Sequence, residues 1–290
     1  MRSPPLPPGR HLELPGRGGS FIRELAAPPG GPTLVLLHGW TAASDVTWFR
    51  CYQALGQSFG VVAIDQRGHG RGIRSARRFR LDDCADDVAA LVELLELGQR
   101  GPVIVVGYSM GGCVAQLLWR RHPGTVDGLV LCSTSGIFAE TEGERRYFAA
   151  LGGLGLAARL TPAPLRRQLA RRLVERRVVD CDLREWILEE LHRNDAIALL
   201  QAGHALGRFD SRSWSGQIDV PAAVVVTTAD RQVRPARQRT LAASIPGSTL
   251  HEVEGGHDSC VSAPERLLPV LIAACSSVAA RATRQPAATA

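Results

Sequence analysis

The chain has 290 residues, of which 45% are apolar and 21% are charged, and its 34 basic and 28 acidic residues give a formal net charge of +6. This length and apolar content predict one large or two small globular domains and exclude disordered, collagen-like and small disulfide-rich proteins. All 34 basic residues are arginine, which excludes mechanisms that need a lysine, such as a Schiff base or a P-loop.

The first expected element is an antiparallel edge hairpin, formed by residues 12–14 and 21–25 around a glycine-rich turn. Five short apolar runs follow it and are the predicted strands of the core. Each run is continuously apolar rather than alternating, which indicates burial on both faces, as in a parallel sheet covered by helices. The five runs are residues 33–37, 61–64, 102–106, 128–132 and 222–226.

Segments with the apolar spacing of a helix lie between these runs. Residues 81–97 form one such segment, with Asp82 or Asp83 available as an N-cap, and residues 110–122 form another that Pro123 ends. The alternation of strands and helices predicts the α/β fold class, with a doubly wound sheet.

The alternation is interrupted between residues 136 and 216. This stretch contains several helical patterns and no strand run, and a structureless loop of that length would be unusual in a compact domain. We therefore expect a helical cap at 136–216, inserted into an α/β core made of residues 1–135 and 217–290. Residues 281–290 are polar and low in complexity, so we expect a frayed tail there.

A candidate nucleophile follows the third apolar run, in the sequence Gly107-Tyr-Ser-Met-Gly-Gly112. This GxSxG motif stands between a predicted strand and a predicted helix, which is the context of a nucleophile elbow. Gly107 and Gly111 permit the tight turn in which Ser109 would project its hydroxyl above the sheet. A plain glycine-rich turn is the alternative interpretation, but the position between a buried strand and a helix start favours a nucleophile.

A serine hydroxyl is a weak nucleophile that needs a base, and the base needs an acid to orient it. Asp230 closes the last apolar run, and His257 follows a weaker strand in Val253-Glu-Gly-Gly-His257. Both stand at the carboxyl ends of predicted strands, where open α/β sheets place their sites. Asp258 is adjacent to His257, but adjacent residues rarely point their side chains at each other, so Asp230 is the predicted acid.

The third requirement of this chemistry is an oxyanion hole of two backbone N–H groups. Met110, the residue after the nucleophile, is expected to supply one donor. The loop after the first apolar run reads His38-Gly39-Trp40. The Trp40 N–H is the expected second donor, and Gly39 permits the turn.

These features together resemble the α/β-hydrolase fold family, and specifically its lid-bearing serine esterases. The resemblance extends over about residues 33–281 and implies a mostly parallel eight-stranded sheet, a lid inserted after strand six and no cofactor. It also implies that His38 orients the oxyanion loop and that Arg67 and His69 anchor a structural turn. It rests on His38-Gly39-Trp40, Asp65-Gln-Arg-Gly-His-Gly70, Gly107-Tyr-Ser-Met-Gly-Gly112, Asp230 and Gly256-His257.

Other ligand classes have little support in the sequence. No HExxH or CxxC spacing and no GxGxxG after a strand occurs, so we expect neither a metal site nor a dinucleotide cofactor. No nucleic-acid motif accompanies the basic charge, and only 5% of the residues are aromatic, so no nucleic-acid partner is expected.

The cysteines and the apolar stretches indicate the compartment. The chain has seven cysteines, an odd number, and they show no paired spacing, which favours buried free thiols in a reducing compartment. Because no apolar stretch is long enough for a membrane helix, we expect no membrane span and a cytoplasmic protein.

The predicted function is hydrolysis of a small-molecule carboxylic ester, thioester or lactone through an acyl-enzyme on Ser109. A serine nucleophile disfavours the relatives that use aspartate for alkyl displacement. Cofactor-free perhydrolases and carbon–carbon bond hydrolases remain alternatives, although the latter usually have Asn and Trp where this chain has Tyr108 and Asp258. An acyltransferase and a non-catalytic ligand-binding protein on the same fold also remain open, and the sequence does not indicate the oligomeric state.

The predicted cap carries an arginine-rich stretch in which Glu175 is the one acid. Leu165, Leu169 and Leu173 recur at i, i+4 spacing, so we interpret the stretch as a solvated helix with an apolar packing stripe. Apolar cap residues at 147–151 and 154–156 would then line a pocket for uncharged esters of short to medium chain. The alternative is that some of the arginines attract an anionic substrate or an acidic carrier. The arginines are Arg159, Arg166, Arg167, Arg171, Arg172, Arg176 and Arg177.

Overall fold

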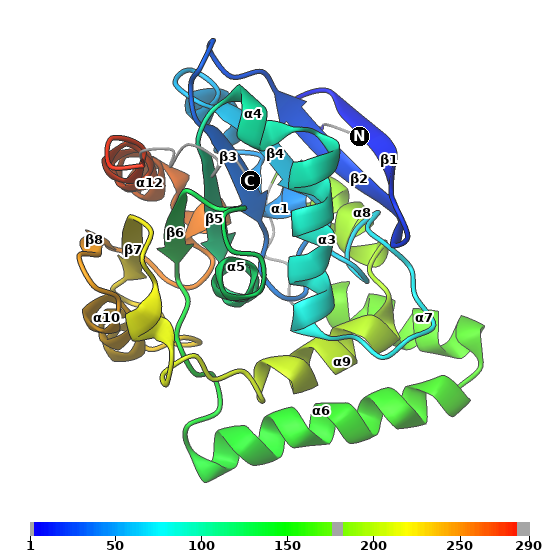
Figure 1. Ribbon diagram of the computed structural model, residues 1–290. Helices are drawn as coiled ribbons and strands as arrows, with labels where there is room; N and C mark the ends of the chain where they lie inside the picture. The colour runs from blue at the N-terminus through cyan, green and yellow to red at the C-terminus, as the bar shows by residue number, and fades with distance from the viewer. Residues whose placement is uncertain (1–2, 176–181, 283–290) are drawn as a thin grey trace.

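The computed structural model describes residues 3–175 and 182–282, and for residues 167, 170, 171, 173 and 174 it describes the backbone only. An eight-stranded sheet lies at its centre, with the strand order β1-β2-β4-β3-β5-β6-β7-β8 (Figure 1). The strands are β1 (Gly9–Leu14), β2 (Gly18–Leu25), β3 (Thr33–Leu37), β4 (Gly60–Ile64), β5 (Val103–Tyr108), β6 (Gly128–Cys132), β7 (Ala222–Thr227) and β8 (Thr249–Val253).

The pairing of these strands confirms the predicted fold class. β1 and β2 form an antiparallel hairpin at one edge, and β2 pairs antiparallel with β4. All other neighbouring strands are parallel. β3 to β6 are buried along their whole length, as expected for strands covered on both faces.

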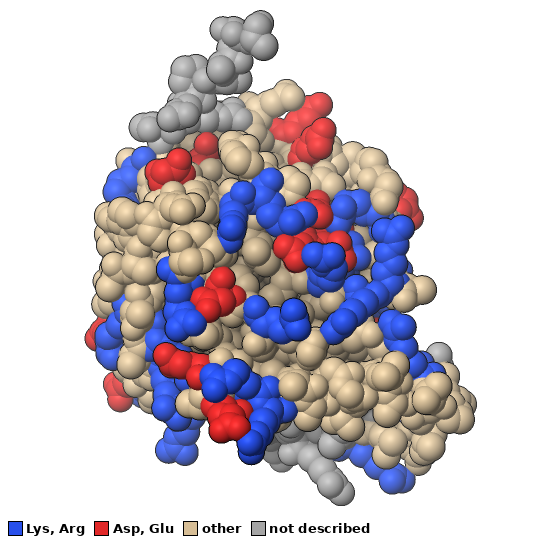
Figure 2. Space-filling model, turned by 60° about the horizontal axis from the view of Figure 1, so that its bottom comes forward, with Lys and Arg blue, Asp and Glu red and all other residues tan. Residues whose placement is uncertain are grey.

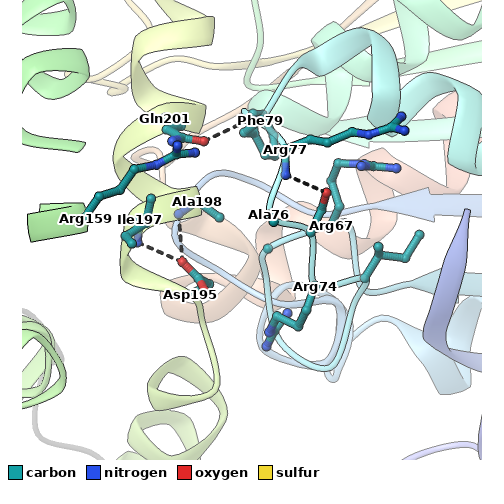
Figure 3. A pocket seen from close by; sticks show the side chains of 13 residues that line it. Arg67, Arg74, Ala76, Arg77, Phe79, Arg159, Asp195, Ile197, Ala198 and Gln201 are labelled. Atoms are coloured by element: carbon teal, nitrogen blue, oxygen red, sulfur yellow. Dashed lines mark hydrogen bonds between the residues drawn. The ribbon is translucent and has the colours of Figure 1, made fainter. Parts of the chain in front are cut away.

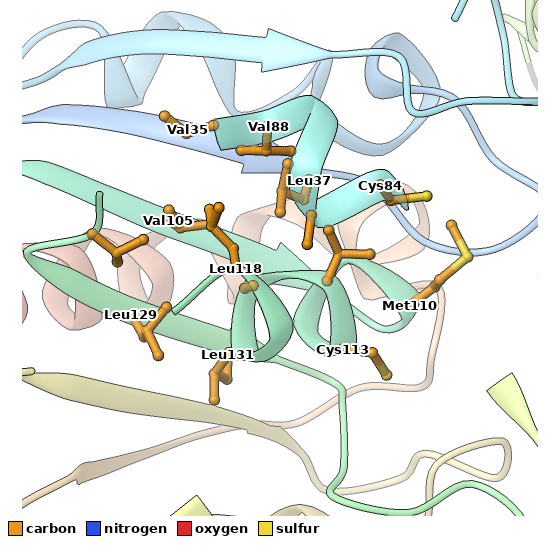
Figure 4. Close-up of a cluster of buried hydrophobic side chains, with 14 of the residues drawn as sticks. Val35, Leu37, Cys84, Val88, Val105, Met110, Cys113, Leu118, Leu129 and Leu131 are labelled. Atoms are coloured by element: carbon orange, nitrogen blue, oxygen red, sulfur yellow. The ribbon is translucent and has the colours of Figure 1, made fainter. Parts of the chain in front are cut away.

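Two layers of helices cover the sheet, and successive residues of a strand face opposite layers. Val35 and Leu37 of β3 pack in one core cluster with α3 (Leu81–Leu94), α5 (Met110–Arg121) and α10 (Pro235–Ser244), part of which Figure 4 shows. Leu34 and Leu36 point the other way, into a cluster with α1 (Ser44–Trp48), α2 (Tyr52–Leu55), α11 (Ser259–Ser262) and α12 (Pro264–Ala279).

Helix α3 differs from its prediction at both ends. It starts after Arg80, which makes no side-chain capping bond, and Asp82 and Asp83 lie inside its first turn. The N-cap prediction was therefore wrong, because Leu81 is itself buried in the core and the helix must already include it. The helix ends at Leu94 rather than at residue 97, since Glu96 has a left-handed backbone with φ of 50° and a new helix, α4 (Leu97–Arg100), follows.

Four helices lie between β6 and β7, in the segment where a lid was expected. They are α6 (Glu142–Leu160), α7 (Ala163–Glu175), α8 (Arg184–His192) and α9 (Ala196–Leu206), and a 3-10 turn, Ser215–Gln217, follows them. Figure 1 shows α6 and α9 running side by side below the sheet. We call residues 136–216 the helical insertion, and its status as a separate cap domain with these boundaries stays a prediction.

Two leucines of the apolar stripe predicted in this insertion are exposed. Leu165 and Leu169 on α7 are 48% and 49% exposed, so the packing prediction was wrong for these two residues. The side chain of Leu173 lies outside the described part of the structure, as do Arg176 and Arg177. Seen from the side of the insertion, arginines and acidic side chains are interspersed over the surface (Figure 2).

Several smaller predictions can also be compared with the structure. Six cysteines are free and buried, namely Cys51, Cys84, Cys113, Cys132, Cys260 and Cys275, whereas Cys181 lies outside the described residues. Among the helices described, none is long and apolar enough to cross a membrane. Arg281 is not frayed, because its guanidinium donates to the carbonyl oxygens of Ser277, Gly247 and Ala222. Residues 283–290 of the predicted tail are not described.

Candidate active site

Ser109 stands in a strained turn between β5 and α5. Its backbone has φ of 54° and ψ of −114°, a region that residues with a side chain rarely adopt. A Cβ atom on Gly107 would collide with the Gly111 carbonyl, and one on Gly111 would collide with the Leu37 carbonyl. The two glycines are therefore required for the close approach of strand and helix, and the turn has the geometry expected of a nucleophile elbow.

His257 lies between Ser109 and Asp230. Its Nε2 is 2.8 Å from the Ser109 Oγ, and its Nδ1 is 2.7 Å from the Asp230 Oδ2. The structure thus brings together the three side chains that the sequence predicted as nucleophile, base and acid. With the proton on Nδ1, the imidazole donates to the carboxylate and can accept the hydroxyl proton of Ser109.

The Asp230 carboxylate is buried and fully hydrogen-bonded. Its Oδ1 accepts the backbone N–H groups of Gln232 and Val233 at 2.8 and 2.9 Å. Its Oδ2 accepts from the Thr227 hydroxyl at 2.9 Å and from the Gln238 amide at 3.2 Å, besides His257. These bonds fix the carboxylate toward the imidazole.

The same surroundings keep the carboxylate ionised. Burial alone would raise the pKa of Asp230, but the hydrogen bond and charge of His257 and the two backbone N–H groups outweigh burial and lower that pKa. Asp230 is therefore a carboxylate, not a carboxylic acid, near neutral pH. Asp258, the neighbour of His257, makes no hydrogen bond to the imidazole and instead precedes α11.

Tyr108 is a residue that sequence reasoning did not assign to the site. Its hydroxyl donates to the carbonyl oxygen of His257 at 2.9 Å, and so connects the strand before Ser109 to the loop that carries the base. Burial raises the pKa of Tyr108 well above its ordinary value, so the phenol remains a donor. Thr227 and Gln238 were missed as well. Only their proximity to Asp230 in the fold identifies them.

The loop after β3 lies against Ser109. A Cβ atom on Gly39 would be 3.4 Å from the Ser109 Cβ, so this glycine leaves room beside the hydroxyl. Within residues 3–175 and 182–282, the backbone N–H groups of Trp40 and Met110 donate to no protein acceptor. Two unused N–H groups beside the nucleophile are what an oxyanion hole requires.

His38 holds this loop in place. Its Nε2 accepts the backbone N–H of Gln66 at 3.0 Å, so its Nδ1 carries the proton and donates to the Gly39 carbonyl at 2.8 Å. Burial lowers the pKa of His38 despite the opposing charge of Asp65, and a neutral ring fits this bonding. The Arg67 guanidinium makes two hydrogen bonds to Asp87, and the His69 Nδ1 lies 3.0 Å from the Arg67 carbonyl oxygen. These contacts anchor the turn after β4.

A cavity of about 460 Å³ opens onto Ser109 and His257. Among the side chains that the structure describes, Glu144 and Asp258 are the carboxylates that line it, and no arginine does. Of the apolar insertion residues expected in the pocket, Tyr147 and Phe148 line it, whereas Leu151 is buried elsewhere and Leu154 and Leu156 are exposed. Other apolar side chains around it include Trp40, Val46, Phe138, Leu206, Val233 and Val261.

A second cavity, of about 230 Å³, shares no lining residue with the first (Figure 3). It lies between the loop at residues 67–79 and helix α9, and Arg159 reaches it from α6. Among the arginines of this stretch whose side chains are described, Arg159 is the one that lines either of these two cavities. Arg166 instead donates to the carbonyl oxygens of Ala158 and Thr161.

The described residues show no cluster of metal-binding side chains. Within the described ranges, no three His, Cys, Asp or Glu side chains lie together in a way that could hold a metal ion.

Comparison with known proteins agrees with this fold. A family model of the alpha/beta hydrolase fold matches residues 32–264. Over 225 residues the chain is 32% identical to a pimeloyl-[acyl-carrier protein] methyl ester esterase of Chromobacterium violaceum, covering 77% of this chain and 85% of that relative.

Two solved structures are similar in fold. A bromoperoxidase from Bacillus anthracis superposes with a TM-score of 0.76 at 17% identity, over 93% of this chain and all of that one. A thermophilic esterase from Thermogutta terrifontis superposes with a TM-score of 0.73 at 21% identity, over 93% of this chain and 99% of that one. At these identities the likeness concerns the fold alone.

Proposed function

The chain belongs to the α/β-hydrolase fold family, which contains esterases and other hydrolases, and we propose that it is a serine hydrolase of carboxylic esters, thioesters or lactones. The observation that carries the proposal is the hydrogen-bonded series Ser109, His257 and Asp230 at the floor of a cavity. A ligand-binding protein without turnover would have no physical need for all three side chains in this arrangement.

In the proposed reaction, the Ser109 Oγ attacks the carbonyl carbon of the substrate while its proton passes to the His257 Nε2. Asp230 stabilises the imidazolium that forms. The negative charge on the former carbonyl oxygen is bound by the N–H groups of Trp40 and Met110. His257 then gives its proton to the leaving oxygen or sulfur, which departs and leaves an acyl group on Ser109.

Water completes the cycle through the same groups. His257 takes a proton from a water molecule, whose oxygen attacks the acyl carbon, and the oxyanion hole again binds the charge. Collapse of this second intermediate releases the carboxylic acid and returns the proton from His257 to Ser109. Each proton taken up is given back, so no cofactor is needed.

The charges around the cavity favour an uncharged acyl group. Burial opposes ionisation of Glu144, but hydrogen bonds from Arg237 and from the Thr141 N–H lower its pKa to about 2, so it is ionised at neutral pH. A substrate carboxylate would meet Asp258 and Glu144, whose charge the ion pair with Arg237 offsets in part, and among the side chains that the structure describes no arginine lines the cavity. We therefore favour neutral esters, as the sequence interpretation did, over the alternative of an anionic substrate attracted by arginines of the insertion.

The experiment compares a neutral p-nitrophenyl ester with its ω-carboxylate analogue of equal length, at low and high salt. The proposal predicts a higher kcat/KM for the neutral ester and little salt dependence of its turnover. A preference for the carboxylate that disappears in salt would mean that arginines recruit the substrate. No turnover of any ester, thioester or lactone would contradict the proposed function itself.

A further inference from the structure

Thr41 has a backbone conformation that its side chain disfavours. It follows Trp40, the proposed oxyanion donor, and its φ is 66°. A β-branched residue is a clear outlier in this left-handed region, and such a conformation persists only where the surroundings enforce it. One local bond closes this turn, from the Ala42 N–H to the Gly39 carbonyl oxygen at 3.4 Å. The contacts that hold the Trp40 side chain and the Thr41 carbonyl come from the helical insertion, more than 150 positions away in the chain.

Asn194 supplies the first of these contacts. It lies in the turn between α8 and α9 and is the only asparagine of the chain. Its Nδ2 donates to the Thr41 carbonyl oxygen at 3.0 Å, and its Oδ1 accepts the Gly70 N–H at 2.6 Å. One amide group therefore ties the strained residue of the oxyanion loop to the turn after β4.

Helix α9 supplies the second contact, through the side chain of Trp40. The indole N–H donates to the Leu199 carbonyl oxygen at 2.8 Å. The ring also fits against Gly203, where a Cβ atom would lie only 2.6 Å from the Trp40 Cζ2. Because Leu199 and Gly203 both belong to α9, the position of this helix sets the position of Trp40.

The segment 39–41 is thus held at three points. His38 holds the Gly39 carbonyl from the core, α9 holds the Trp40 indole, and Asn194 holds the Thr41 carbonyl. The Trp40 N–H lies between these points. We propose that Asn194 is a positioning residue of the oxyanion hole and that the helical insertion, through Asn194 and α9, keeps the Trp40 N–H directed at the reacting carbonyl.

This inference rests on the proposed function, and it adds that the oxyanion hole depends on the position of the helical insertion. Two of the three fixed points belong to the insertion, so a shift of the insertion away from the core would release Thr41 and the oxyanion donor together. Binding of substrate and binding of the transition state would then be affected differently, because the oxyanion exists only in the latter.

Two variants test the role of Asn194. Asn194→Ala removes both hydrogen bonds, and Asn194→Asp keeps an acceptor for Gly70 but has no N–H for Thr41. Both should lower kcat at least tenfold with KM within about twofold, since one oxyanion donor is typically worth 10²–10³ in kcat. Affinity for a trifluoromethyl ketone, which forms an oxyanion on Ser109, should fall by the same factor as kcat/KM.

A second change distinguishes positioning from general support of the fold. Thr41→Gly removes the penalty of the left-handed conformation, so the loop should keep its shape without Asn194. The double variant Asn194→Ala/Thr41→Gly should therefore recover a substantial part of the lost kcat. If Asn194→Ala does not fold, the test uses Trp40→Phe in its place. This variant keeps the backbone N–H of residue 40 but cannot donate to the Leu199 carbonyl, and its kcat should fall by the same factor.

The matched control is Gln201→Ala, on the same helix. The Gln201 side chain accepts the Phe79 N–H at 2.8 Å, so this variant removes an insertion-to-core bond that does not touch residues 39–41 (Figure 3). Its kcat should stay within about twofold of the unmodified protein. An equal loss in Gln201→Ala, or full kcat in Asn194→Ala and Asn194→Asp, would overturn the inference. If the unmodified protein turned over no ester, the proposed function would fail instead.

Discussion

The Nε2 atom of His257 lies 2.8 Å from the hydroxyl oxygen of Ser109, although the two residues are 148 positions apart in the chain. Parallel pairing places the carboxyl ends of β5 and β8 at the same edge of the sheet, and both residues follow such an end. The Tyr108 hydroxyl then fixes the distance between them by binding the His257 carbonyl. The proposed base is therefore positioned by the strand that precedes the proposed nucleophile.

This relationship gives a prediction for Tyr108. Tyr108→Phe removes the donor to the His257 carbonyl and should lower kcat about tenfold, since a misdirected base weakens proton transfer. Steady-state kinetics on a neutral ester measures this loss of kcat. Tyr52→Phe is the matched control, because the Tyr52 hydroxyl is also buried but donates to Asp45, away from the catalytic groups. Equal kcat in the two variants would contradict the role of Tyr108.

The identity of the acid gives a second prediction. Asp230→Asn should lower kcat roughly 10⁴-fold, because an amide cannot stabilise the imidazolium and favours the wrong tautomer of His257. Asp258→Asn should change kcat far less, since that side chain makes no bond to the imidazole. Measuring kcat of the two variants at one pH tests this assignment. A larger loss of kcat in Asp258→Asn than in Asp230→Asn would exclude Asp230 as the acid.

A third prediction concerns stability at low pH. The buried Asp45 carboxylate accepts hydrogen bonds from Arg23 and Arg71, which outweigh the effect of burial and lower its pKa below the ordinary 3.8. A carboxylate with a lowered folded-state pKa contributes stability above its unfolded-state pKa and loses it as the pH falls through the folded-state value. The free energy of unfolding should thus hold from pH 7 to about 5 and fall progressively below pH 4.

Asp45→Asn provides the corresponding variant. It should destabilise the protein at pH 6 by on the order of 3 kcal/mol, because two partly buried arginines lose their carboxylate. It should also reduce the slope of stability against pH between 4 and 3. Urea denaturation across this range measures both quantities, and an unchanged slope would show that other carboxylates govern acid unfolding.

The exposed leucines of the insertion give a fourth prediction. Leu160 is 86% exposed and Leu151, on the same helix, is 8% exposed. Leu160→Ser should change the free energy of unfolding by less than about 0.5 kcal/mol, whereas Leu151→Ser should cost about 2 to 4 kcal/mol. Thermal denaturation of the two variants tests this. A large loss in Leu160→Ser would show that this leucine is covered in solution.

The fold, and the proximity of Ser109, His257 and Asp230, could be predicted from the sequence for physical reasons. Continuous apolar runs mark strands buried on both faces, and a glycine-flanked serine between a strand and a helix marks a tight turn. Asp230 and His257 could be proposed because each follows a strand end. These patterns are local, and a parallel sheet brings their carboxyl ends together.

Other features depend on contacts that no local pattern contains. The spacing of Leu165 and Leu169 indicates an amphipathic helix, but spacing cannot tell whether a neighbour covers the apolar side, and here both remain half exposed. No sequence pattern assigned a role to Asn194, because its partners Thr41 and Gly70 are over 120 positions away. Supporting residues of this kind become recognisable only once the chain is folded.

The central claim is that Ser109 is the nucleophile, and labelling with a fluorophosphonate tests it most directly. Intact-mass and peptide analysis should show one adduct per chain, located on Ser109. Labelling should be absent in Ser109→Ala and slowed by several orders of magnitude in His257→Ala, because the hydroxyl then has no base. Labelling of another residue, or undiminished ester turnover by Ser109→Ala, would contradict the account.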